Sequence, residues 1–361
     1  MKLLIITQKV DKNDSDLSFF HRWIEEFAKQ TDEVFVVSQF VGNYDLPENA
    51  KVFSLGKEKE FSKIRQLFNF YKLLFKNLSK IDAVFVHMIP MWAVLGWPIF
   101  KVKRKKVFLW YTHKSVNFWL KFAEKMVFKI FTASSESFRL SSKKVMVIGH
   151  GIDVDKFKAQ SPQKESLWLP TGQAKLKATV KNFKLKIISV GRIAEAKNQK
   201  KLLEAADILA RQKNFRNFEI EIIGGPILER DFEYFKNLKK FVSEKKLEEF
   251  VEFIGDVPHE NIQDYYEKAD IFIHLSKTGS IDKVVLEALV VGVPVYSSSE
   301  AFKDILPSQF LISGDPKELA EKIASFTPPS HETTSALRDY VVQNHSLNNL
   351  IFKIIKEINA A

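Results

Sequence analysis

The sequence predicts an α/β protein made of two doubly wound, Rossmann-like domains. Two observations support this fold class. Short runs rich in Val, Ile and Phe alternate with amphipathic helical patterns, and a polar stretch divides that alternation into two halves of similar design. Most of the runs are continuously apolar, as expected of parallel strands that are buried on both faces. A length of 361 residues is sufficient for two substantial cores.

The first half contains six predicted strands. The initial run, MKLLIIT, is too short for the apolar region of a signal peptide and predicts a buried strand over Leu3–Thr7. Phe20, Trp23, Ile24 and Phe27 then follow at helical spacing. The other strands are expected at Glu33–Ser38, Ala83–His87, Val107–Trp110, Ile130–Ala133 and Val145–Ile148.

One apolar segment, Ala83–Phe100, approaches the roughly 20 residues that a membrane-spanning helix needs. His87, Pro90 and Pro98 interrupt it, because the histidine is polar and prolines break a continuous helix. We therefore expect a strand at Ala83–His87, a turn at Pro90 and then an apolar helix or loop. A transmembrane span is the alternative.

The second half repeats the alternation of strands and helices. Leu202, Leu203, Ala206 and Leu209 form one helical stripe. Strands are expected at Lys186–Val190, Glu219–Gly224, Val251–Ile254, Ile271–His274 and Pro294–Ser297.

The predicted domain boundaries follow a break in this pattern. The polar stretch Ala159–Phe183 contains two prolines and a glycine, so we assign 1–160 to an N-terminal domain, 161–183 to a linker and 184–340 to a C-terminal domain. Residues 341–361 are expected to form a helix that returns to the N-terminal domain, with Ser346 placed to cap it. Ligands of such domains bind at the carboxyl ends of the strands, so a cleft between the two domains is expected.

Charge is distributed unevenly along the chain. Residues 1–150 carry 25 Lys and Arg but 14 Asp and Glu, which accounts for the whole net charge of +11, whereas the rest carries 30 of each. This asymmetry indicates that the two halves have different partners. The chain has no Cys, which excludes disulfides and Cys-ligated metal sites and suggests a reducing compartment.

The first motif with chemical character is VGRIAEAK, at Val190–Lys197. A buried strand ends at Gly191, and the cations Arg192 and Lys197 follow five residues apart. Cations between a strand end and a helix suit a phosphate or diphosphate, because arginine grips two oxygens and lysine adds a point charge. The alternative is a pair of solvated surface cations.

The second motif is SKTGSIDKVVLEA, at Ser276–Ala288, where a loop of Ser, Thr and Gly leads into an apolar helix. Loop amides and the helix N-terminus would direct N–H donors at an anion. Glu287 lies about one turn into the helix among apolar residues, where a carboxylate needs partners. The hydroxyls of a ribose would supply them; the alternative is that Glu287 occupies the polar side of a surface helix.

Several histidines lie close to predicted strand ends. His113 follows the strand Val107–Trp110, and His87 and His274 end other strands, so each is a candidate for the site, although a lone histidine is more often structural. His150 lies between two glycines in Ile148–Asp153, which permits a tight turn. A plain interdomain turn is the alternative there.

Taken in order, four segments resemble the C-terminal domain of the retaining GT-B glycosyltransferases of family 4, the glycosyl transferases group 1. They are GRIAEAKNQKKLLEA, IIGGP, VEFIGDVPHENIQDYYEKADIFIHLS and VVLEALVVGVPV. GHGIDVDKF is similar to a segment that precedes the domain linker in that family. The resemblance covers the whole chain and is strongest from Val145 to Tyr296. Each motif is weak alone, but the ordered set is specific.

The resemblance implies roles for individual residues. Arg192 and Lys197 match the diphosphate-binding pair of the family. Glu287 matches the second carboxylate of its E-x(7)-E motif, which holds the ribose, and His113 matches a histidine near the donor sugar. Val257 matches the place where backbone groups meet the base. The full expected set is His113, Arg192, Lys197 and Glu287 as catalytic residues, and Gly191, Gly224, Val257, Gly279, Ser280, Ile281, Asp282, Lys283 and Val284 as donor-binding residues.

The sequence departs from the family pattern at three places. The first carboxylate of E-x(7)-E would fall at Gly279, and Asp282, three residues on, is the candidate replacement. The loop after the first strand, usually glycine-rich, reads DKNDSDLS. His150 stands where the family has asparagine. The donor sugar therefore stays open.

The family implies transfer of a hexosyl group from a UDP- or GDP-sugar with retention at the anomeric carbon. Negative charge grows on the leaving diphosphate, where Arg192, Lys197 and the helix N-terminus at Ser280–Lys283 would stabilise it. Neither a metal nor another cofactor is expected, because the sequence has no clustered acidic metal motif. The alternatives are a non-catalytic sugar-nucleotide or nucleic-acid binding protein, and an epimerase or phosphorylase of the same fold. No nucleic-acid partner is expected, since no aromatic-interleaved recognition motif is present.

The basic half is expected to bind the acceptor, a glycan or a lipid-linked molecule. An amphipathic helix is predicted over Phe61–Lys80, and the KVKRKK cluster at Lys101–Lys106 follows Trp92 and Trp97. Basic clusters beside amphipathic aromatic segments favour an anionic membrane surface. We therefore expect a cytoplasmic protein that is peripheral on the inner face of the cell membrane. Ordinary solvated helix faces are the alternative.

Overall fold

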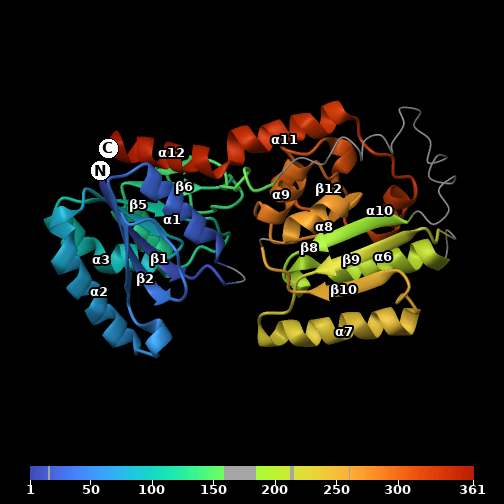
Figure 1. Ribbon diagram of the computed structural model, residues 1–361, viewed down its shortest axis with the longest axis horizontal. Coiled ribbons are helices and arrows are strands. Elements are labelled where there is room, and N and C mark those ends of the chain that lie inside the picture. The colour runs from blue at the N-terminus through green and yellow to red at the C-terminus, as the bar shows by residue number, and fades with distance from the viewer. Residues whose placement is uncertain (15–16, 158–183, 212–214, 260) are drawn as a thin grey trace. The chain divides into compact units, whose positions relative to one another are not determined.

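The computed structural model describes residues 1–14, 17–157, 184–211, 215–259 and 261–361. This part of the chain forms two compact units (Figure 1), of which the first comprises Met1–Asp153 and Asn344–Ala361 and the second Val154–Gln343. The linker predicted at 161–183 lies outside the described residues. Each unit contains a parallel sheet with helices, so the predicted fold class is confirmed.

The first unit is built on a 7-stranded parallel sheet in the order β3-β2-β1-β4-β5-β6-β7. The interior strand β1 pairs Leu3 with Val34 of β2 on one side and with Ala83 of β4 on the other. The strand bounds are β1 Lys2–Val10, β2 Glu33–Val41, β3 Ala50–Ser54, β4 Ala83–His87, β5 Lys106–Trp110, β6 Lys129–Thr132 and β7 Val145–Val147.

Alternate residues of β1 enter two separate cores. Leu3 and Ile5 pack with helices α1 and α12 on one face of the sheet. Leu4 and Ile6 pack with helices α2, α3 and α4 on the other face. Because both faces are covered, the strands read as continuous apolar runs. The helix bounds are α1 Phe19–Lys29, α2 Lys63–Asn77, α3 Pro90–Val102, α4 Phe118–Met126 and α12 Leu347–Asn359.

The C-terminal helix α12 belongs to the first unit and packs against α1, as predicted. Ser346 occupies the expected N-cap position, but its side chain makes no capping hydrogen bond. Its backbone forms a bridge with Ile152 instead. The apolar face of α12 is buried throughout, at Leu347, Leu350, Ile351, Ile354, Ile355 and Ile358.

The apolar segment Ala83–Phe100 forms strand β4 and most of helix α3. Pro90 is the first residue of α3, whereas Pro98 lies inside the helix and does not end it, contrary to expectation. Proline within a helix removes one i→i−4 hydrogen bond, and α3 continues past it. Within the described residues, no helix has both the length and the apolar character that crossing a membrane requires.

Two elements of the first unit differ from the expected pattern. Strand β3 was not predicted, because AKVFS is short, lies at the sheet edge and buries its side chains only in part. The helix expected over Phe61–Lys80 is α2 followed by a single 3-10 turn at Leu78–Lys80. Ser62 begins α2 by accepting a hydrogen bond from the Arg65 backbone N–H.

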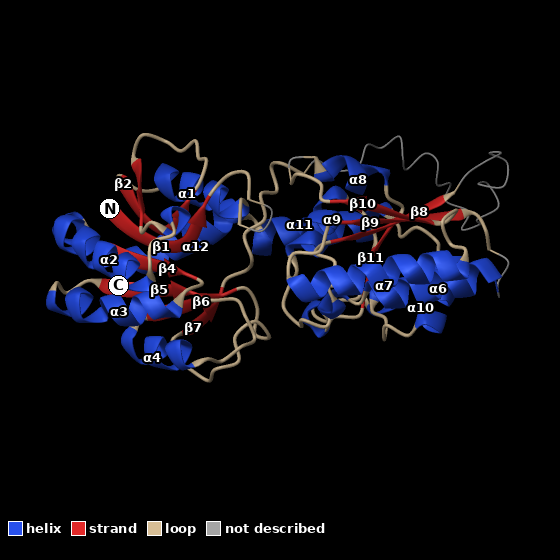
Figure 2. Cartoon of the chain, turned by 90° about the horizontal axis from the view of Figure 1, so that it is seen from below, coloured by secondary structure: helices blue, strands red, loops and turns tan. Residues whose placement is uncertain are grey.

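The second unit contains a 5-stranded parallel sheet in the order β10-β9-β8-β11-β12. Figure 2 shows helices α6, α7 and α10 on one face of this sheet and α8 and α9 on the other. The strand bounds are β8 Leu185–Val190, β9 Phe218–Ile223, β10 Val251–Gly255, β11 Ile271–His274 and β12 Val295–Ser297. The helix bounds are α6 Gln199–Arg211, α7 Glu229–Lys245, α8 Ile262–Lys268, α9 Lys283–Val291, α10 Pro316–Ala324 and α11 His331–His345.

The strand order of the second unit creates a switch point between β8 and β11. These two strands are neighbours in the sheet, yet the helix after β8 lies on one face and the helix after β11 lies on the other. The loops at their carboxyl ends therefore diverge around a crevice, which is where doubly wound sheets bind their ligands.

Replacing Ile351 by alanine should lower the free energy of unfolding of the first unit by about 2–5 kcal/mol, because the side chain is 0% exposed in the core beside α1. Its neighbour Phe352 is 60% exposed and serves as the control. Phe352→Ala should change the free energy of unfolding by less than about 0.5 kcal/mol. Urea unfolding followed by circular dichroism measures both, and equal effects would contradict the packing of α12.

Candidate functional site

Two loops meet at the carboxyl ends of β8 and β11. The first runs from Gly191 into a short 3-10 helix, Glu195–Lys197. The second runs from the end of β11 into α9. The Lys277 N–H donates to the Ala196 carbonyl oxygen at 2.9 Å and joins the two loops. The switch point of the sheet thus brings together the two motifs that the sequence singles out.

The strand ends around these loops leave little room for side chains. Gly191 and Gly224 have φ angles of 137° and 122°, which side chains disfavour. A Cβ at Gly224 would also clash with the Gly191 carbonyl oxygen. The Gly224 N–H donates to the Gly255 carbonyl oxygen at 2.8 Å. The backbones of β8, β9 and β10 are therefore held together at the edge where the predicted donor-binding glycines lie.

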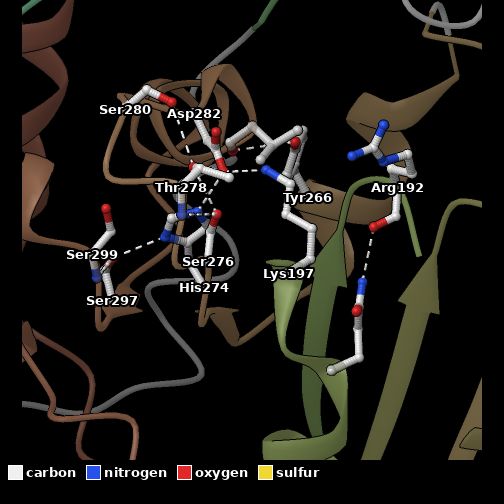
Figure 3. Close-up of polar contacts among 12 residues, drawn as sticks. Arg192, Lys197, Tyr266, His274, Ser276, Thr278, Ser280, Asp282, Ser297 and Ser299 are labelled. Carbon is white, nitrogen blue, oxygen red and sulfur yellow. Dashed lines mark hydrogen bonds and ion pairs between the residues drawn. The ribbon is translucent and has the colours of Figure 1, made fainter. Parts of the chain in front are cut away.

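Asp282 is the centre of a polar cluster (Figure 3). Its Oδ2 accepts a hydrogen bond from Lys197 Nζ at 2.5 Å and lies 2.8 Å from His274 Nε2. His274 Nδ1 lies 2.9 Å from Ser297 Oγ, and that oxygen accepts the Ser299 N–H at 3.2 Å. A consistent assignment has Nε2 of the imidazole donating to Asp282 and Nδ1 accepting from Ser297.

The contacts of Asp282 keep its carboxylate charged. Burial alone would raise its pKa, but the hydrogen bond from His274 and the positive charge of Lys197 outweigh burial and hold the pKa of Asp282 well below its ordinary value. At neutral pH the carboxylate is therefore ionised and balances the charge of Lys197.

The loop before α9 exposes hydroxyl groups and a helix N-terminus. Ser276 Oγ lies 2.9 Å from Thr278 Oγ1, and Ser280 Oγ donates to that Thr278 oxygen at 3.4 Å. Asp282 occupies the N-cap position of α9, yet its side chain makes no capping hydrogen bond. The first-turn amides of α9 are consequently not capped by that carboxylate and suit an external anion.

Glu287 lies on α9 and is 4% exposed. Its Oε1 lies 3.0 Å from His259 Nε2, and its Oε2 accepts a hydrogen bond from the Tyr266 hydroxyl at 3.1 Å. Lys156 Nζ lies 2.9 Å from His259 Nδ1. Because an ammonium can only donate, Nδ1 accepts from Lys156 and Nε2 donates to Glu287. The protein thus supplies the partners that burial of this carboxylate requires.

These contacts also set the protonation of the groups around Glu287. Burial opposes its charge, but the hydrogen bond from His259 outweighs burial and the pKa of Glu287 lies below its ordinary value. Burial lowers the pKa of Lys283 well below its usual range, and the negative charge of Glu287 opposes that shift. Burial, together with Glu287, raises the pKa of Tyr266, so the tyrosine remains a neutral donor.

Arg192 stands apart from the Asp282 cluster in Figure 3. Its Nε lies 3.6 Å from Asp231 Oδ2, near the start of α7. Its carbonyl oxygen accepts a hydrogen bond from Gln199 Nε2 at 3.0 Å. The contacts between described residues join Lys197, but not Arg192, to Asp282. Of the predicted diphosphate-binding pair, only Lys197 therefore contacts Asp282.

The remaining predicted residues lie in three places. Val257 follows the end of β10, and Gly279–Val284 form the loop and first residues of α9. His113 is exposed in the loop after β5 of the first unit, where its Nδ1 accepts the Ser115 N–H at 3.0 Å. Their roles stay predictions.

The sequence interpretation missed His259 and Tyr266. They reach Glu287 from positions 28 and 21 residues away, on different elements, so no local pattern shows the contact. The available signal was the burial of Glu287, which required partners. His259 also lies in the same VPHE segment as Val257.

The arrangement is suited to binding an anion. It combines the Lys197 ammonium, the N-terminus of α9 and the hydroxyls of the β11 loop at one strand edge. Across the described residues, no group of three or more His, Asp or Glu side chains is placed to hold a metal ion.

Residues 173–338 match the model of the family Glycosyl transferases group 1. The amylovoran biosynthesis glycosyltransferase AmsK of Erwinia amylovora is 36% identical over 123 residues, which are 32% of this chain and 28% of that protein. Mannosylfructose-phosphate synthase of Agrobacterium fabrum is 25% identical over 149 residues, 40% of this chain and 33% of that protein. The chain spans about a third of the length of these two relatives.

Solved structures resemble the chain over its whole length. Anabaena HepE in complex with UDP has a TM-score of 0.75 at 18% identity and covers 100% of both chains. The UDP-glucose complex of the same protein has a TM-score of 0.74 at 16% identity, again with 100% of both chains covered. At these identities the likeness shows the fold, which is the pair of parallel α/β sheets expected of GT-B.

Asp282→Asn should lower the free energy of unfolding at pH 7 by about 1–3 kcal/mol, because it removes the charge that Lys197 and His274 contact. The pKa of Asp282 is lowered on folding. Its ionised form therefore contributes stability above the unfolded carboxyl pKa of about 3.9, and that contribution is lost as the pH falls through the folded value. The difference between variant and wild type should be constant from pH 7 to about pH 5 and shrink below about pH 4.

Urea unfolding over this pH range measures the difference. The exposed Asp264 of α8 provides the control, and Asp264→Asn should change the free energy of unfolding by less than about 0.5 kcal/mol. A difference for Asp282→Asn that is independent of pH would contradict the role of its charge.

Proposed function

Because residues 173–338 match the model of the family Glycosyl transferases group 1, we propose that the chain is a retaining glycosyltransferase of that family. It transfers a hexosyl group from a UDP- or GDP-sugar to a glycan or lipid-linked acceptor. The alternatives are a non-catalytic sugar-nucleotide or nucleic-acid binding protein, and an epimerase or phosphorylase of the same fold.

One observation carries the proposal. Lys197 and Asp282 come from two different loops and meet at the switch point of the second sheet, at the N-terminus of α9. A cation, a helix N-terminus and loop hydroxyls at one strand edge are the groups that bind a diphosphate.

These groups act on the charge that develops during transfer. As the bond from the anomeric carbon to the donor phosphate breaks, negative charge grows on the leaving diphosphate. Lys197 and the amides at the start of α9 stabilise that charge in place, which lowers the barrier. Arg192 adds a second cation when its side chain turns from Asp231 toward the diphosphate.

Asp282 acts as the positioning residue for Lys197. It replaces the carboxylate that is missing at Gly279, and His274 and Ser297 hold it in place. The ionised carboxylate holds the Lys197 ammonium in place, and the arriving diphosphate shares or takes over that ammonium.

Glu287 binds the donor ribose. Each oxygen of a carboxylate accepts about two hydrogen bonds, so a ribose hydroxyl can be accommodated while His259 and Tyr266 remain bound. These two partners fix the orientation of the carboxylate.

Relatives support the choice of donor and acceptor. HepE was crystallised with UDP-glucose, and AmsK is named for amylovoran biosynthesis. A nucleotide-sugar donor and a glycan or lipid-linked glycan acceptor are therefore proposed for this chain.

The first unit supports a location at the cytoplasmic face of a membrane. Helix α2 contains Lys63, Arg65, Lys72 and Lys76 but no acidic residue. It also exposes large apolar side chains that no core requires, at Ile64, Phe68 and Phe75. Cations flanking exposed apolar side chains on one helix suit an anionic lipid surface.

Lys197→Ala should reduce kcat/KM for donor consumption by about 100-fold or more, because it removes a charge that stabilises the leaving diphosphate. Lys201 of α6, which pairs with Glu204 at 3.2 Å, is the matched control. Lys201→Ala should leave kcat/KM within about twofold of wild type. Equal kcat/KM values for Lys197→Ala and Lys201→Ala would contradict a role for Lys197 in transfer.

A panel of UDP- and GDP-sugars tests the reaction class. Glu287→Gln should raise the KM for the productive donor by about tenfold or more with kcat less affected, because it weakens ribose binding. The expected product is a glycoside with the anomeric configuration of the donor. Epimerised nucleotide sugar would indicate an epimerase, and free sugar phosphate would indicate a phosphorylase. Binding without turnover would indicate a non-catalytic binding protein.

A further inference from the structure

A cationic pocket lies in the first unit, apart from the residues of the candidate transfer site, and includes most of the basic cluster Lys101–Lys106. Its volume is about 460 Å³. Five of the residues that line it are cations, at Lys101, Arg104, Lys105, Lys106 and Lys144.

The pocket is at the edge of the sheet where strands begin. Lys106 is the first residue of β5, and Phe128 and Lys144 directly precede β6 and β7. His113, the predicted sugar-binding histidine, follows the opposite end of β5. The pocket is therefore separate from the edge at which this unit is expected to contribute to transfer.

Helix dipoles do not explain so many cations. Helices α3 and α4 both end here, and each helix C-terminus is equivalent to about −0.5 charge. Lys144 serves one of them, because its Nζ donates to the carbonyl oxygens of Glu124 at 2.6 Å and Lys125 at 3.2 Å. Five cations exceed the two dipole ends by about four positive charges.

Carboxylates do not balance this excess either. The ion pairs among described residues include none to Lys101, Arg104, Lys105 or Lys106. Asp82, which accepts the Lys2 N–H at 2.7 Å, and Glu124, which accepts the Ser142 hydroxyl at 2.7 Å, form no ion pair with these four cations. The positive charge is thus left for a ligand.

Arg104 adds a second, independent observation. It follows α3 with φ +52°, in the left-handed region where a helix usually ends on glycine. A residue with a long side chain is disfavoured there, so Arg104 places a cation at the pocket at some cost in backbone strain, as Lys246 does at the end of α7.

The pocket is also rimmed by apolar side chains. Lys101 Nζ lies 4.7 Å from the centre of the Trp97 ring, and Lys106 Nζ lies 4.7 Å from that of Phe128. Phe128 lines the pocket and is 44% exposed, and Val102, which follows Lys101 in the chain, is 80% exposed. A soluble anion gains nothing from such a rim, whereas a phospholipid surface presents phosphate and acyl chain together.

We propose that this pocket binds the phosphate headgroup of an anionic phospholipid. The site goes beyond the proposed transfer reaction and depends on that proposal only for the membrane location. Headgroup binding would anchor the first unit through the edge opposite to His113, so that the carboxyl ends of its strands stay free for an acceptor.

Vesicle flotation tests the site with phosphatidylcholine vesicles that do or do not contain phosphatidylglycerol. The triple variant Lys101→Gln, Arg104→Gln, Lys105→Gln should lower the partition coefficient onto the anionic vesicles by about 100-fold, since each cation near the surface contributes substantially to binding. The matched control is Lys236→Gln, Lys239→Gln, Lys240→Gln on α7, which removes three exposed cations, one of them over the Phe235 ring. An equal loss in both variants, or none in the pocket variant, overturns the proposal.

Two further arms separate the sources of phosphate. Val102→Ser should weaken vesicle binding, because it removes an exposed apolar side chain next to Lys101 without changing charge. Calorimetric titration with inorganic pyrophosphate should give the same affinity for the wild-type protein and the triple variant, because pyrophosphate that binds at Lys197 and α9 does not use the pocket. Tight pyrophosphate binding, lost in the triple variant, together with no effect of Val102→Ser, would identify a soluble phosphate site instead. Binding of single-stranded RNA in place of vesicles, lost in the triple variant, would identify a nucleic-acid surface.

Failure of the pocket proposal can be distinguished from failure of the proposed glycosyl transfer. With a soluble acceptor, the triple variant should turn over at the wild-type rate, because the pocket takes no part in transfer. Wild-type protein that binds anionic vesicles but shows no transfer would overturn the proposed function and leave the pocket in place.

Arg104→Gly separates a structural role from a binding role. Relief of the left-handed strain should raise Tm by about 2–4 °C. Vesicle binding should fall in the same variant, because one pocket cation is lost. A higher Tm with unchanged vesicle binding would remove Arg104 from the site.

Discussion

The candidate site depends on the carboxylate of Asp282. Its Oδ2 contacts Lys197, which lies in the loop after β8, and His274, which ends β11. Ser297 of β12 fixes the imidazole from its other side. Three neighbouring strands of the second sheet thus contribute to one buried charge network, which is stable because each charged group in it has a partner. The network explains how a site can keep an ordered lysine although the carboxylate expected at Gly279 is absent.

Strand direction determines where chemistry can occur in each unit. All strands within a sheet are parallel, so their carboxyl ends share one edge. In the second unit that edge holds Gly191, Lys197 and Asp282 around a switch point. In the first unit the opposite edge holds the cationic pocket, between the ends of α3 and α4. Part of the positive charge of the sequence is therefore clustered at this pocket of the first unit, whereas Lys197 of the second unit is paired with Asp282.

Much of the fold was predictable because its signal is local. Continuous apolar runs identified eleven of the strands within a few residues of their ends, and the stripe of α12 identified its buried face. Strand β3 escaped because AKVFS is an edge strand with little burial. The site was predictable only in outline. The motif positions of Lys197 and Glu287 could be assigned, but the contacts of Glu287 with His259 and Tyr266, and of Asp282 with His274, form across loops and strands, so they depend on the tertiary fold.

The central claim is that the edge formed by β8, β11 and α9 binds the diphosphate of a nucleotide sugar. A crystal structure of the protein with UDP, and another with GDP, tests it most directly. In at least one of them, the account predicts diphosphate oxygens within hydrogen-bond distance of Lys197 Nζ and of the first-turn amides of α9, with a ribose hydroxyl at Glu287. A nucleotide bound at any other place, with the contact between Lys197 and Asp282 undisturbed, would contradict it.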